Sequence, residues 1–286
     1  MPRMISGIPD VTLANPRADR VKQVRALSGR PARSRHGQFL VEGPQGVREA
    51  VRHAAADVRD VYLTPAAAER YAEIVDETLD AGLHLHVGTV EVLEAMSPDA
   101  QGLLAVVRAR PLDLGDALRG VGTRPLLVAV LANVRDPGNA GTVIRAADAA
   151  GADLVVLAGE SVDVHNPKVV RSTAGSLFHL PVVTGLPLPD AVAALHAAGC
   201  SVLAADGTGE HDLDELLDVA AAAPTGQPDL AGSTAWVFGN EAWGLPEADR
   251  ALADAVVRVP IRGLAESLNL ATAATVCLYA SGRAQR

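Results

Sequence analysis

The sequence has little cysteine and no recognisable metal-ligand pattern. Its only two cysteines, Cys200 and Cys277, lie in apolar surroundings without a CxxC pattern or a histidine partner. Neither a disulfide framework nor a zinc site is therefore expected, and both thiols are predicted to be buried and reduced. None of the eight histidines belongs to an HExxH pattern or to a His, Asp and Ser order. We therefore expect no bound metal.

Membrane and secretion signals are also lacking. No run approaches the roughly 20 apolar residues that a membrane helix requires, and residues 1–10 contain no apolar signal segment. Apolar residues make up 49% and charged residues 21% of the chain, which is ordinary for a folded soluble protein. With 286 residues, the chain is long enough for two modest domains. A cytoplasmic two-domain protein is expected.

The net charge of −9 is unevenly distributed. Residues 1–125 carry 16 basic and 16 acidic side chains, whereas residues 126–286 carry 9 and 18. A run of basic residues opposed only by Asp19 lies between positions 17 and 35: Arg17, Arg20, Lys22, Arg25, Arg30, Arg33 and Arg35. Such clustering is either a surface for nucleic-acid phosphates or a solvated helix face.

Strand and helix patterns alternate along the chain. They predict a small α/β domain over residues 1–110, a linker rich in proline and glycine over 111–123, and a second α/β domain over 124–286. The strands of the second domain are the more apolar, as a sheet covered on both faces requires. Finer predictions include a helix over 65–81, a strand over 178–183, a mobile surface insert over 217–232 and a helix that begins at Ser267.

Three loops of the second domain combine amides, a carboxylate and arginines with glycine and proline, each after an apolar strand-like run. They are residues 133–145, 237–246 and 259–270. This is the composition of ligand-binding loops rather than of a core. Three such loops in one domain suggest a shared site.

The residues that carry the pattern are few and occur in a fixed order. They are Asn139 and Arg145, then Gly239-Asn240-Glu241 with Gly244-Leu245, and then Pro260 with Ser267-Leu268-Asn269; residues 166–181 fit the same pattern. In order, spacing and content they resemble the signature motifs of the SpoU/TrmH family of RNA 2'-O-ribose methyltransferases, in the SPOUT superfamily. The resemblance covers the chain from about residue 17 to its end.

This resemblance implies a fold, a cofactor and partners. The expected fold is a small N-terminal α/β substrate-binding domain followed by a C-terminal SPOUT α/β domain with a deep trefoil knot. The expected cofactor is S-adenosyl-L-methionine, the expected substrate is RNA, and the enzyme is expected to be a homodimer. Composition and periodicity alone would give a plain doubly wound sheet, because knots are very rare.

The resemblance also implies roles for individual residues. The catalytic set is Arg145, Asn139, Glu241, Ser267 and Asn269. The set that binds the cofactor is Gly239, Asn240, Gly244, Val259, Ile261 and Leu268. Since the guanidinium pKa is above ~12, we expect Arg145 to bind the phosphate beside the target ribose, although a role as base stays open. Ser267 has a second interpretation as the N-cap of the helix that follows.

The predicted RNA-binding residues are basic: Arg17, Arg20, Lys22, Arg25, Arg33, Arg35, Lys168 and Arg171. Ribosomal 23S RNA is the expected substrate, because residues 39–43 (Phe-Leu-Val-Glu-Gly) resemble the substrate-binding domain of the family's ribosomal members. Transfer RNA is the alternative.

Two rival interpretations come from the same loops. A noncatalytic RNA-binding member of the fold would lose Arg145, Glu241 or Asn269, and all three are present. A nucleotide-binding dehydrogenase would need the G-x-G-x-x-G fingerprint, but residues 136–141 contain only Gly138 and Gly141.

Overall fold

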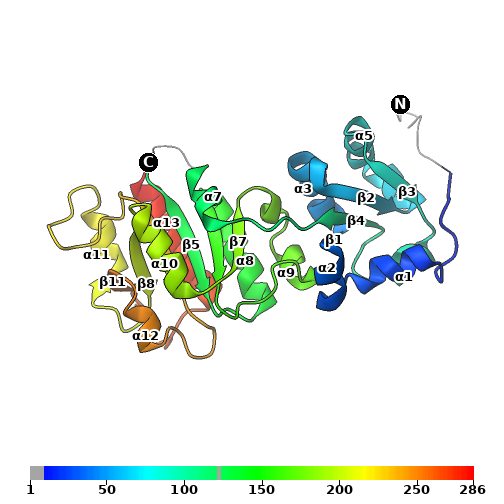
Figure 1. The fold of residues 1–286 in the computed structure, drawn as a ribbon. Coiled ribbons are helices and arrows are strands. Elements are labelled where there is room, and N and C mark those ends of the chain that lie inside the picture. Colours follow the sequence, from blue (N-terminus) through cyan, green and yellow to red (C-terminus); the bar gives the residue numbers. More distant parts are fainter. Residues whose placement is uncertain (1–9, 121–123) are drawn as a thin grey trace. The chain divides into compact units, whose positions relative to one another are not determined.

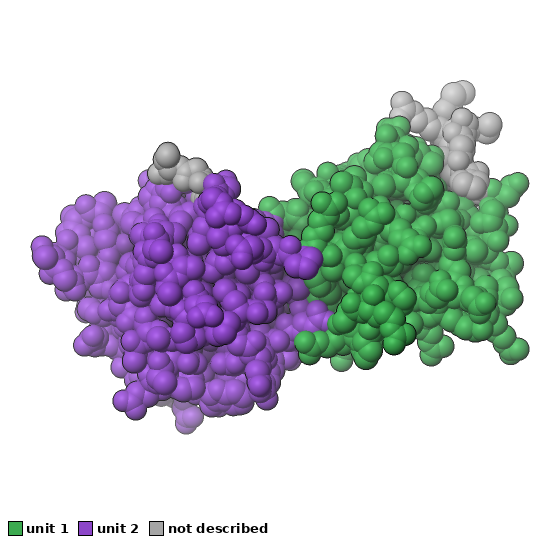
Figure 2. Space-filling model, viewed as in Figure 1, with its two compact units in different colours: residues 1–110, 165–179 green, residues 111–164, 180–286 purple. Residues whose placement is uncertain are grey.

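The computed structural model describes residues 10–120 and 124–286. Residues 1–9 and residues 121–123, the end of the predicted linker, lie outside the described residues. The chain forms two compact units, coloured separately in Figure 2. Unit 1 contains the residues up to 110 together with 165–179, and unit 2 contains 111–164 and 180–286. None of the helices in the described part of the chain has the length and apolar character to cross a bilayer.

Unit 1 is built on a four-stranded mixed sheet with helices packed on it (Figure 1). The strands, in spatial order, are β1 (Gln38–Glu42), β4 (Leu103–Arg108), β2 (Val58–Leu63) and β3 (His84–Val87). Strand β4 is antiparallel to both neighbours, whereas β2 and β3 are parallel. The helices are α1 (Asp19–Ala26), α2 (Arg30–His36), α3 (Gly43–Ala54), η1 (Ala55–Asp57), α4 (Pro65–Arg70), α5 (Ala72–Asp80), α6 (Val90–Met96), α9 (Pro167–Ser172) and η2 (Ser176–Phe178).

Two helical features of unit 1 differ from the prediction. The helix expected over 65–81 is divided into α4 and α5 at Tyr71, which has non-helical dihedral angles (φ −120°, ψ 49°) and packs against the apolar core. Helix α2 has no predicted counterpart. Its sequence, Arg-Pro-Ala-Arg-Ser-Arg-His, has no apolar periodicity from which a helix could be inferred.

Residues 165–179 pack into unit 1 although they lie between two strands of unit 2 in the sequence. Val170 joins the unit 1 core, which also contains Phe39 and Val41. The His179 ring lies 3.1 Å from the carboxylate of Glu49 on α3. These contacts replace the strand predicted over 178–183: η2 ends at Phe178, and the strand begins only at Val182.

A buried carboxylate anchors this segment. The Glu42 side chain at the end of β1 is only 4% exposed, and it is ion-paired with Arg171 of α9. Glu42 also accepts a hydrogen bond from the Ser97 hydroxyl. Arg171 contacts Asp99 as well, at 3.1 Å. Burying a charge without a partner is costly, so the pairing of Arg171 with Glu42 holds α9 against β1.

Unit 2 is a seven-stranded parallel sheet with helices on its faces (Figure 1). Its strands, in spatial order, are β7 (Val182–Leu186), β6 (Leu154–Ala158), β5 (Leu127–Ala132), β10 (Thr234–Phe238), β8 (Ser201–Ala205), β11 (Ala255–Arg258) and β9 (His211–Asp212). Its helices are α7 (Leu114–Arg119), α8 (Pro137–Ala150), α10 (Leu188–Ala197), α11 (Leu213–Asp218), α12 (Glu247–Arg250) and α13 (Leu270–Ala284). The predicted α/β class with a SPOUT-like second domain is confirmed, and the trefoil knot stays a prediction.

Two segments of unit 2 are more ordered than the sequence suggested. Helix α7 lies within the predicted linker, and its Leu114 packs into the unit 2 core. The stretch 217–232 was predicted as a mobile surface insert, and the surface position is wrong for Leu230. Leu230 is fully buried, and the Asp229 carboxylate accepts hydrogen bonds from the backbone N–H groups of Ala221 and Ala231.

Both cysteines are buried in unit 2, as predicted, and they are not bonded to each other. Burial, with a further contribution from the Asp153 charge, raises the pKa of the Cys200 thiol to about 11. Burial also raises the pKa of Cys277. Both side chains therefore stay as unreactive thiols at neutral pH.

The anchor at Glu42 can be tested by removing its basic partner. Arg171→Ala is expected to destabilise unit 1 by roughly 3 kcal/mol, since it leaves Glu42 buried without its cation. Lys22→Ala is the matched control, because its pair with Asp19 is exposed and contributes little. Denaturant unfolding of the full chain measures both variants. Equal unfolding midpoints for Arg171→Ala and the wild type would show that this pair does not anchor α9.

Candidate functional site

The three predicted loops all begin at carboxyl ends of strands in the middle of the unit 2 sheet, where β5 is next to β10 and β8 lies between β10 and β11. The first follows β5, the second follows β10, and the third follows β11. Ligand sites of open parallel sheets lie at this edge. The sheet order therefore explains why loops more than 100 residues apart in the sequence reach one place.

Glu241 joins the second loop to the first. Its carboxylate accepts hydrogen bonds from the backbone N–H groups of Arg135, at 3.3 Å, and Asp136, at 3.1 Å. The side-chain amide of Asn139 donates to the same carboxylate at 3.4 Å. These donors precede and begin α8, whose positive N-terminal end also favours a nearby anion.

Asn139 joins the first loop to the third. Its side-chain oxygen accepts a hydrogen bond from the Asn269 amide at 3.0 Å. The Asn269 oxygen in turn accepts from the backbone N–H groups of Ala271 and Thr272 at the start of α13. A carboxylate only accepts hydrogen bonds, so the Asn139 amide must direct its nitrogen to Glu241, and this leaves its oxygen for Asn269. The three motifs thus meet in one hydrogen-bonded chain.

A second set of hydrogen bonds fixes the loops that carry these motif residues. The Asn240 side chain is buried and donates to the backbone oxygen of Asn133 at 2.7 Å. Asn133 has a left-handed backbone (φ 57°), which asparagine tolerates better than most residues. Its side-chain oxygen accepts from the backbone N–H of Glu160, just after β6. The loops after β5, β6 and β10 are therefore fixed to one another.

Gly239 is required by the loop itself. A Cβ atom there would overlap the Gly244 backbone and lie only 2.6 Å from the nitrogen of Leu245. The loop is closed by two hydrogen bonds between Asn240 and Gly244, at 3.0 and 2.9 Å. Gly244 adopts a positive φ of 66° to complete the turn. Both glycines thus shape the loop from which Glu241 extends.

Other predicted residues of the third loop are on the surface. Ser267 is exposed, and it has no hydrogen-bond partner among the described residues. The prediction that it caps the following helix is wrong: α13 begins after Asn269, whose side chain is the cap. Ile261 and Leu268 are 39% and 38% exposed, and Val259 is half-buried. The loop therefore presents apolar side chains to solvent.

Arg145 is separate from the hydrogen-bonded chain. It lies on α8, six residues after Asn139, and is exposed. Within the described part of the chain it has no ion-pair or hydrogen-bond partner. Helical side chains lean toward the helix N-terminus, so a side chain as long as that of Arg145 can reach back along α8 toward the motif loops.

Asp206 is a further polar residue at this edge of the sheet that the sequence did not single out. It follows β8, and its carboxylate accepts hydrogen bonds from the backbone N–H and the hydroxyl of Thr208. Burial raises the pKa of Asp206, but the Thr208 hydrogen bonds and the charge of Arg250 outweigh it and hold that pKa below its usual value. Its position directly after strand β8 is the sequence feature that could have marked it as a candidate site residue.

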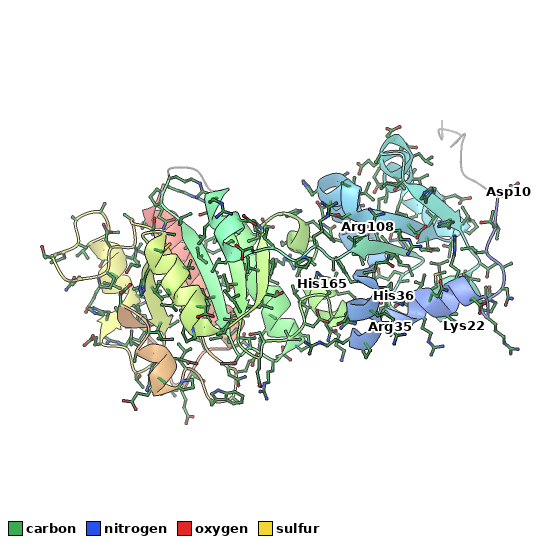
Figure 3. All side chains as sticks on the ribbon, viewed as in Figure 1. Asp10, Lys22, Arg35, His36, Arg108 and His165 are labelled. Atoms are coloured by element: carbon green, nitrogen blue, oxygen red, sulfur yellow. The ribbon has the colours of Figure 1, made fainter. Side chains whose placement is uncertain are left out.

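The predicted RNA-binding residues of unit 1 differ in how exposed their side chains are and in whether they already have hydrogen-bond partners. Arg17, Lys22 and Arg35 are exposed, and Figure 3 shows Lys22 and Arg35 extending from the same side of the unit. Arg20 is exposed but lies 3.2 Å from the ring nitrogens of His86. Arg33 is 6% exposed and donates to the backbone oxygens of Leu27 and Ser28, so it holds the α1–α2 turn.

The remaining predicted cations surround a cleft of about 510 Å³ in unit 1. Arg25 and Lys168 line it, together with Arg171, Met96 and Pro98. Arg171 is engaged by Glu42 and Asp99. The charged groups of Arg25 and Lys168 have no ion-pair partner among the described residues, and both side chains are exposed. These two cations are available to an anionic ligand.

The loop that carries Glu241 can be tested at Gly239. Gly239→Ala should destabilise unit 2 by roughly 1–3 kcal/mol, because the new methyl group meets backbone atoms that cannot move aside. Gly263→Ala is the control, since a Cβ at Gly263 meets no atom within 4 Å. Thermal unfolding and amide exchange at Asn240 and Gly244 report the effect. Unchanged protection of these two amides in Gly239→Ala would contradict the close contact.

Comparison with known families divides the chain in a similar way. Residues 126–279 match the model of the SpoU rRNA Methylase family. Residues 18–105 match the MRM3-like substrate binding domain. The first match covers more than half of the chain and all three motif loops.

Individual relatives match over nearly the whole chain. A 23S rRNA (uridine(2479)-2'-O)-methyltransferase of Streptomyces viridochromogenes is 35% identical over 92% of this chain and 89% of its own. The 23S rRNA (guanosine(2553)-2'-O)-methyltransferase RlmP of Bacillus subtilis is 32% identical over 91% and 94%. The crystal structure of the SpoU methyltransferase AviRb from S. viridochromogenes in complex with AdoMet superposes with a TM-score of 0.76, at 32% identity, over 93% and 98% of the two chains.

Three findings agree. The motif loops meet through hydrogen bonds, relatives match over nearly the whole chain, and the family model matches residues 126–279. The chain belongs to the SpoU rRNA methylase family.

Proposed function

We propose that the protein is an S-adenosylmethionine-dependent methyltransferase that methylates a ribose 2'-hydroxyl of 23S rRNA. The observation that carries this proposal is the chain of hydrogen bonds from Glu241 through Asn139 to Asn269, which gathers the three motifs at one edge of the sheet. Relatives that match over the whole chain are named 23S rRNA 2'-O-methyltransferases. The motif residues of this chain are all present.

The residues at the edge of the sheet suit S-adenosylmethionine. Ile261 and Leu268 offer exposed apolar surface for an adenine ring, and Val259, at the start of the same loop, is half-buried. We assign the loop of Gly239, Asn240 and Gly244 to one wall of the cofactor site; the N–H groups of Asn240 and Gly244 donate to each other's carbonyl oxygens, so they fix the shape of that wall. Such a cofactor, when bound, supplies an electrophilic methyl group on a sulfonium.

Glu241 and Asn139 position the loops, while Arg145 meets the RNA. The Glu241 carboxylate is already occupied by three N–H donors, so it is poorly placed to accept a proton from a substrate hydroxyl. Arg145 has no ion-pair or hydrogen-bond partner in the described part of the chain, and its guanidinium is a planar donor suited to a phosphate. We assign it to the phosphate next to the target ribose, where a charge-assisted contact holds the 2'-hydroxyl for attack. We assign Ser267, which is exposed in the third loop, as a further hydrogen-bonding group.

Unit 1 captures the RNA in this proposal. Its exposed cations Arg17, Lys22 and Arg35 supply charge for phosphates, and Arg25 and Lys168 face the cleft. We leave Arg33 out of the set because it is buried, and Arg171 because Glu42 and Asp99 engage it. The match to a substrate binding domain over residues 18–105 supports this role.

The family and the proposed substrate support proposals for assembly and location. We propose a homodimer, to which the exposed Val276 and Tyr279 of α13 contribute, whereas Leu278 is buried within the subunit. We place the enzyme in the cytoplasm, where bacterial ribosomal RNA is found. Transfer RNA stays the alternative substrate, although the named whole-chain relatives above act on 23S rRNA.

If Arg145 binds the RNA, its replacement should lower methyl transfer without changing cofactor binding. Arg145→Ala should lower methyl transfer to a 23S rRNA transcript by ~10²-fold or more. Calorimetry should find cofactor affinity unchanged, because the residues assigned to the cofactor lie on other loops. Arg283→Ala, an exposed arginine on α13, should behave as the wild type. Near-normal turnover of Arg145→Ala, or loss of cofactor binding, would refute the assigned role.

The role of unit 1 predicts salt-dependent RNA binding through the cleft. Replacing both Arg25 and Lys168 by alanine should weaken RNA affinity and reduce the slope of log K against log salt by about 1.4–1.8, that is, roughly 0.7–0.9 for each lost phosphate contact. The control is Arg108→Ala at the end of β4, which is exposed and lies apart from Lys22 and Arg35 in Figure 3. Point variants are preferable to removing residues 1–110, because that deletion would expose the core residue Val170. An unchanged slope would exclude both cations from the RNA path.

A further inference from the structure

The chain has only two tryptophans, and their surroundings are opposite. Trp236 lies in β10, is fully buried, and donates its indole N–H to Ser281 at 2.9 Å. Trp243 is 54% exposed and lies in the same short loop as Glu241. Leaving a large aromatic side chain in water forgoes a considerable hydrophobic stabilisation. An exposed tryptophan within a loop that carries motif residues therefore suggests a ligand-contacting role.

The position of Trp243 is fixed by the contacts that organise the site. The paired hydrogen bonds between Asn240 and Gly244 close the loop and leave Glu241, Ala242 and Trp243 on its outer side. The guanidinium carbon of Arg135 lies 5.5 Å from the centre of the Trp243 ring, a cation–π contact. The backbone N–H of that same Arg135 donates to Glu241. The indole is thus held at a defined place beside the hydrogen-bonded motif chain.

Arg135 is itself held from the far side by Glu160. The two side chains form an ion pair at 2.6 Å, and both are more than half exposed. The arginine accordingly covers part of one face of the indole, and half of the Trp243 surface remains open to solvent. An aromatic ring backed by a guanidinium is a surface on which unpaired bases of single-stranded RNA stack, because every base has a π-face.

We propose that Trp243, backed by Arg135, is a stacking site for an unpaired nucleobase of the RNA substrate, beside the catalytic loops. This inference rests on the proposed RNA methyltransferase function and adds a residue that binds the base rather than the ribose or the phosphate. It assigns the second motif loop two tasks: Glu241 holds the loops together, and Trp243 positions the nucleotide.

Substitutions at Trp243 separate stacking from simple apolar contact. Trp243→Leu keeps apolar surface but has no π-face, whereas Trp243→Phe keeps an aromatic face. With a 23S rRNA transcript as substrate, Trp243→Leu should raise the KM for RNA by roughly 5- to 150-fold, the range measured for loss of one stacked base. Trp243→Phe should retain most of the affinity. Thermal stability and cofactor affinity should match the wild type, because the side chain is exposed.

Tryptophan fluorescence provides a direct readout. Since Trp236 is buried, RNA added to the wild type should quench the Trp243 emission, and Trp243→Phe should lose that quenching.

A wild-type KM for RNA in Trp243→Leu, with methyl transfer intact, would overturn the stacking site and leave the methyltransferase assignment standing. Quenching by the cofactor alone would instead place Trp243 in the cofactor pocket. A changed mass in light scattering for Trp243→Leu would place it in a subunit interface. Absence of methyl transfer by the wild type would reject the function itself.

Discussion

The carboxylate of Glu241 is the contact on which the rest of the site depends. It is an acceptor-only group, and it lies where two backbone N–H groups and the Asn139 amide all donate to it. The N-terminal end of α8 stabilises its negative charge. Because Glu241 fixes which way the Asn139 amide faces, it also fixes the bond from Asn269 and thereby the start of α13.

This arrangement divides the motif residues into two groups. Glu241, Asn139, Asn269 and Asn240 satisfy one another and the backbone, so they hold three loops at one edge of a parallel sheet. Arg145 on α8 and the third-loop side chains of Ser267 and Leu268 remain exposed beside them. A preorganised active site requires a hydrogen-bonded scaffold with exposed side chains around it. The same division explains why these polar residues lie at the edge of the sheet rather than in the core.

The sequence predicted the alternating elements and the motif loops well, because both are local patterns. The apolar runs that form β1, β2 and β8 are of this local kind, since strand periodicity and flanking turns define them. Contacts between distant residues were not accessible in this way. Nothing local indicates that α9 packs on β1 through Arg171 and Glu42, that Arg33 is buried under the α1–α2 turn, or that Asn269 rather than Ser267 caps α13. The first depends on partners far apart in the sequence, the second on helix α2, which has no apolar periodicity, and the third on where a helix begins. Single-sequence patterns define such boundaries least well.

The most direct test of the account is the chemical position of the methyl group. The wild-type protein would be incubated with unmethylated 23S rRNA transcript and methyl-labelled S-adenosylmethionine, and the RNA would then be hydrolysed in alkali. Alkaline cleavage requires a free 2'-hydroxyl as the attacking group, so a 2'-O-methylated nucleotide survives within a dinucleotide. The account predicts label in an alkali-resistant dinucleotide. Label in mononucleotides, which indicates methylation of a base, or no label in the RNA, would contradict it.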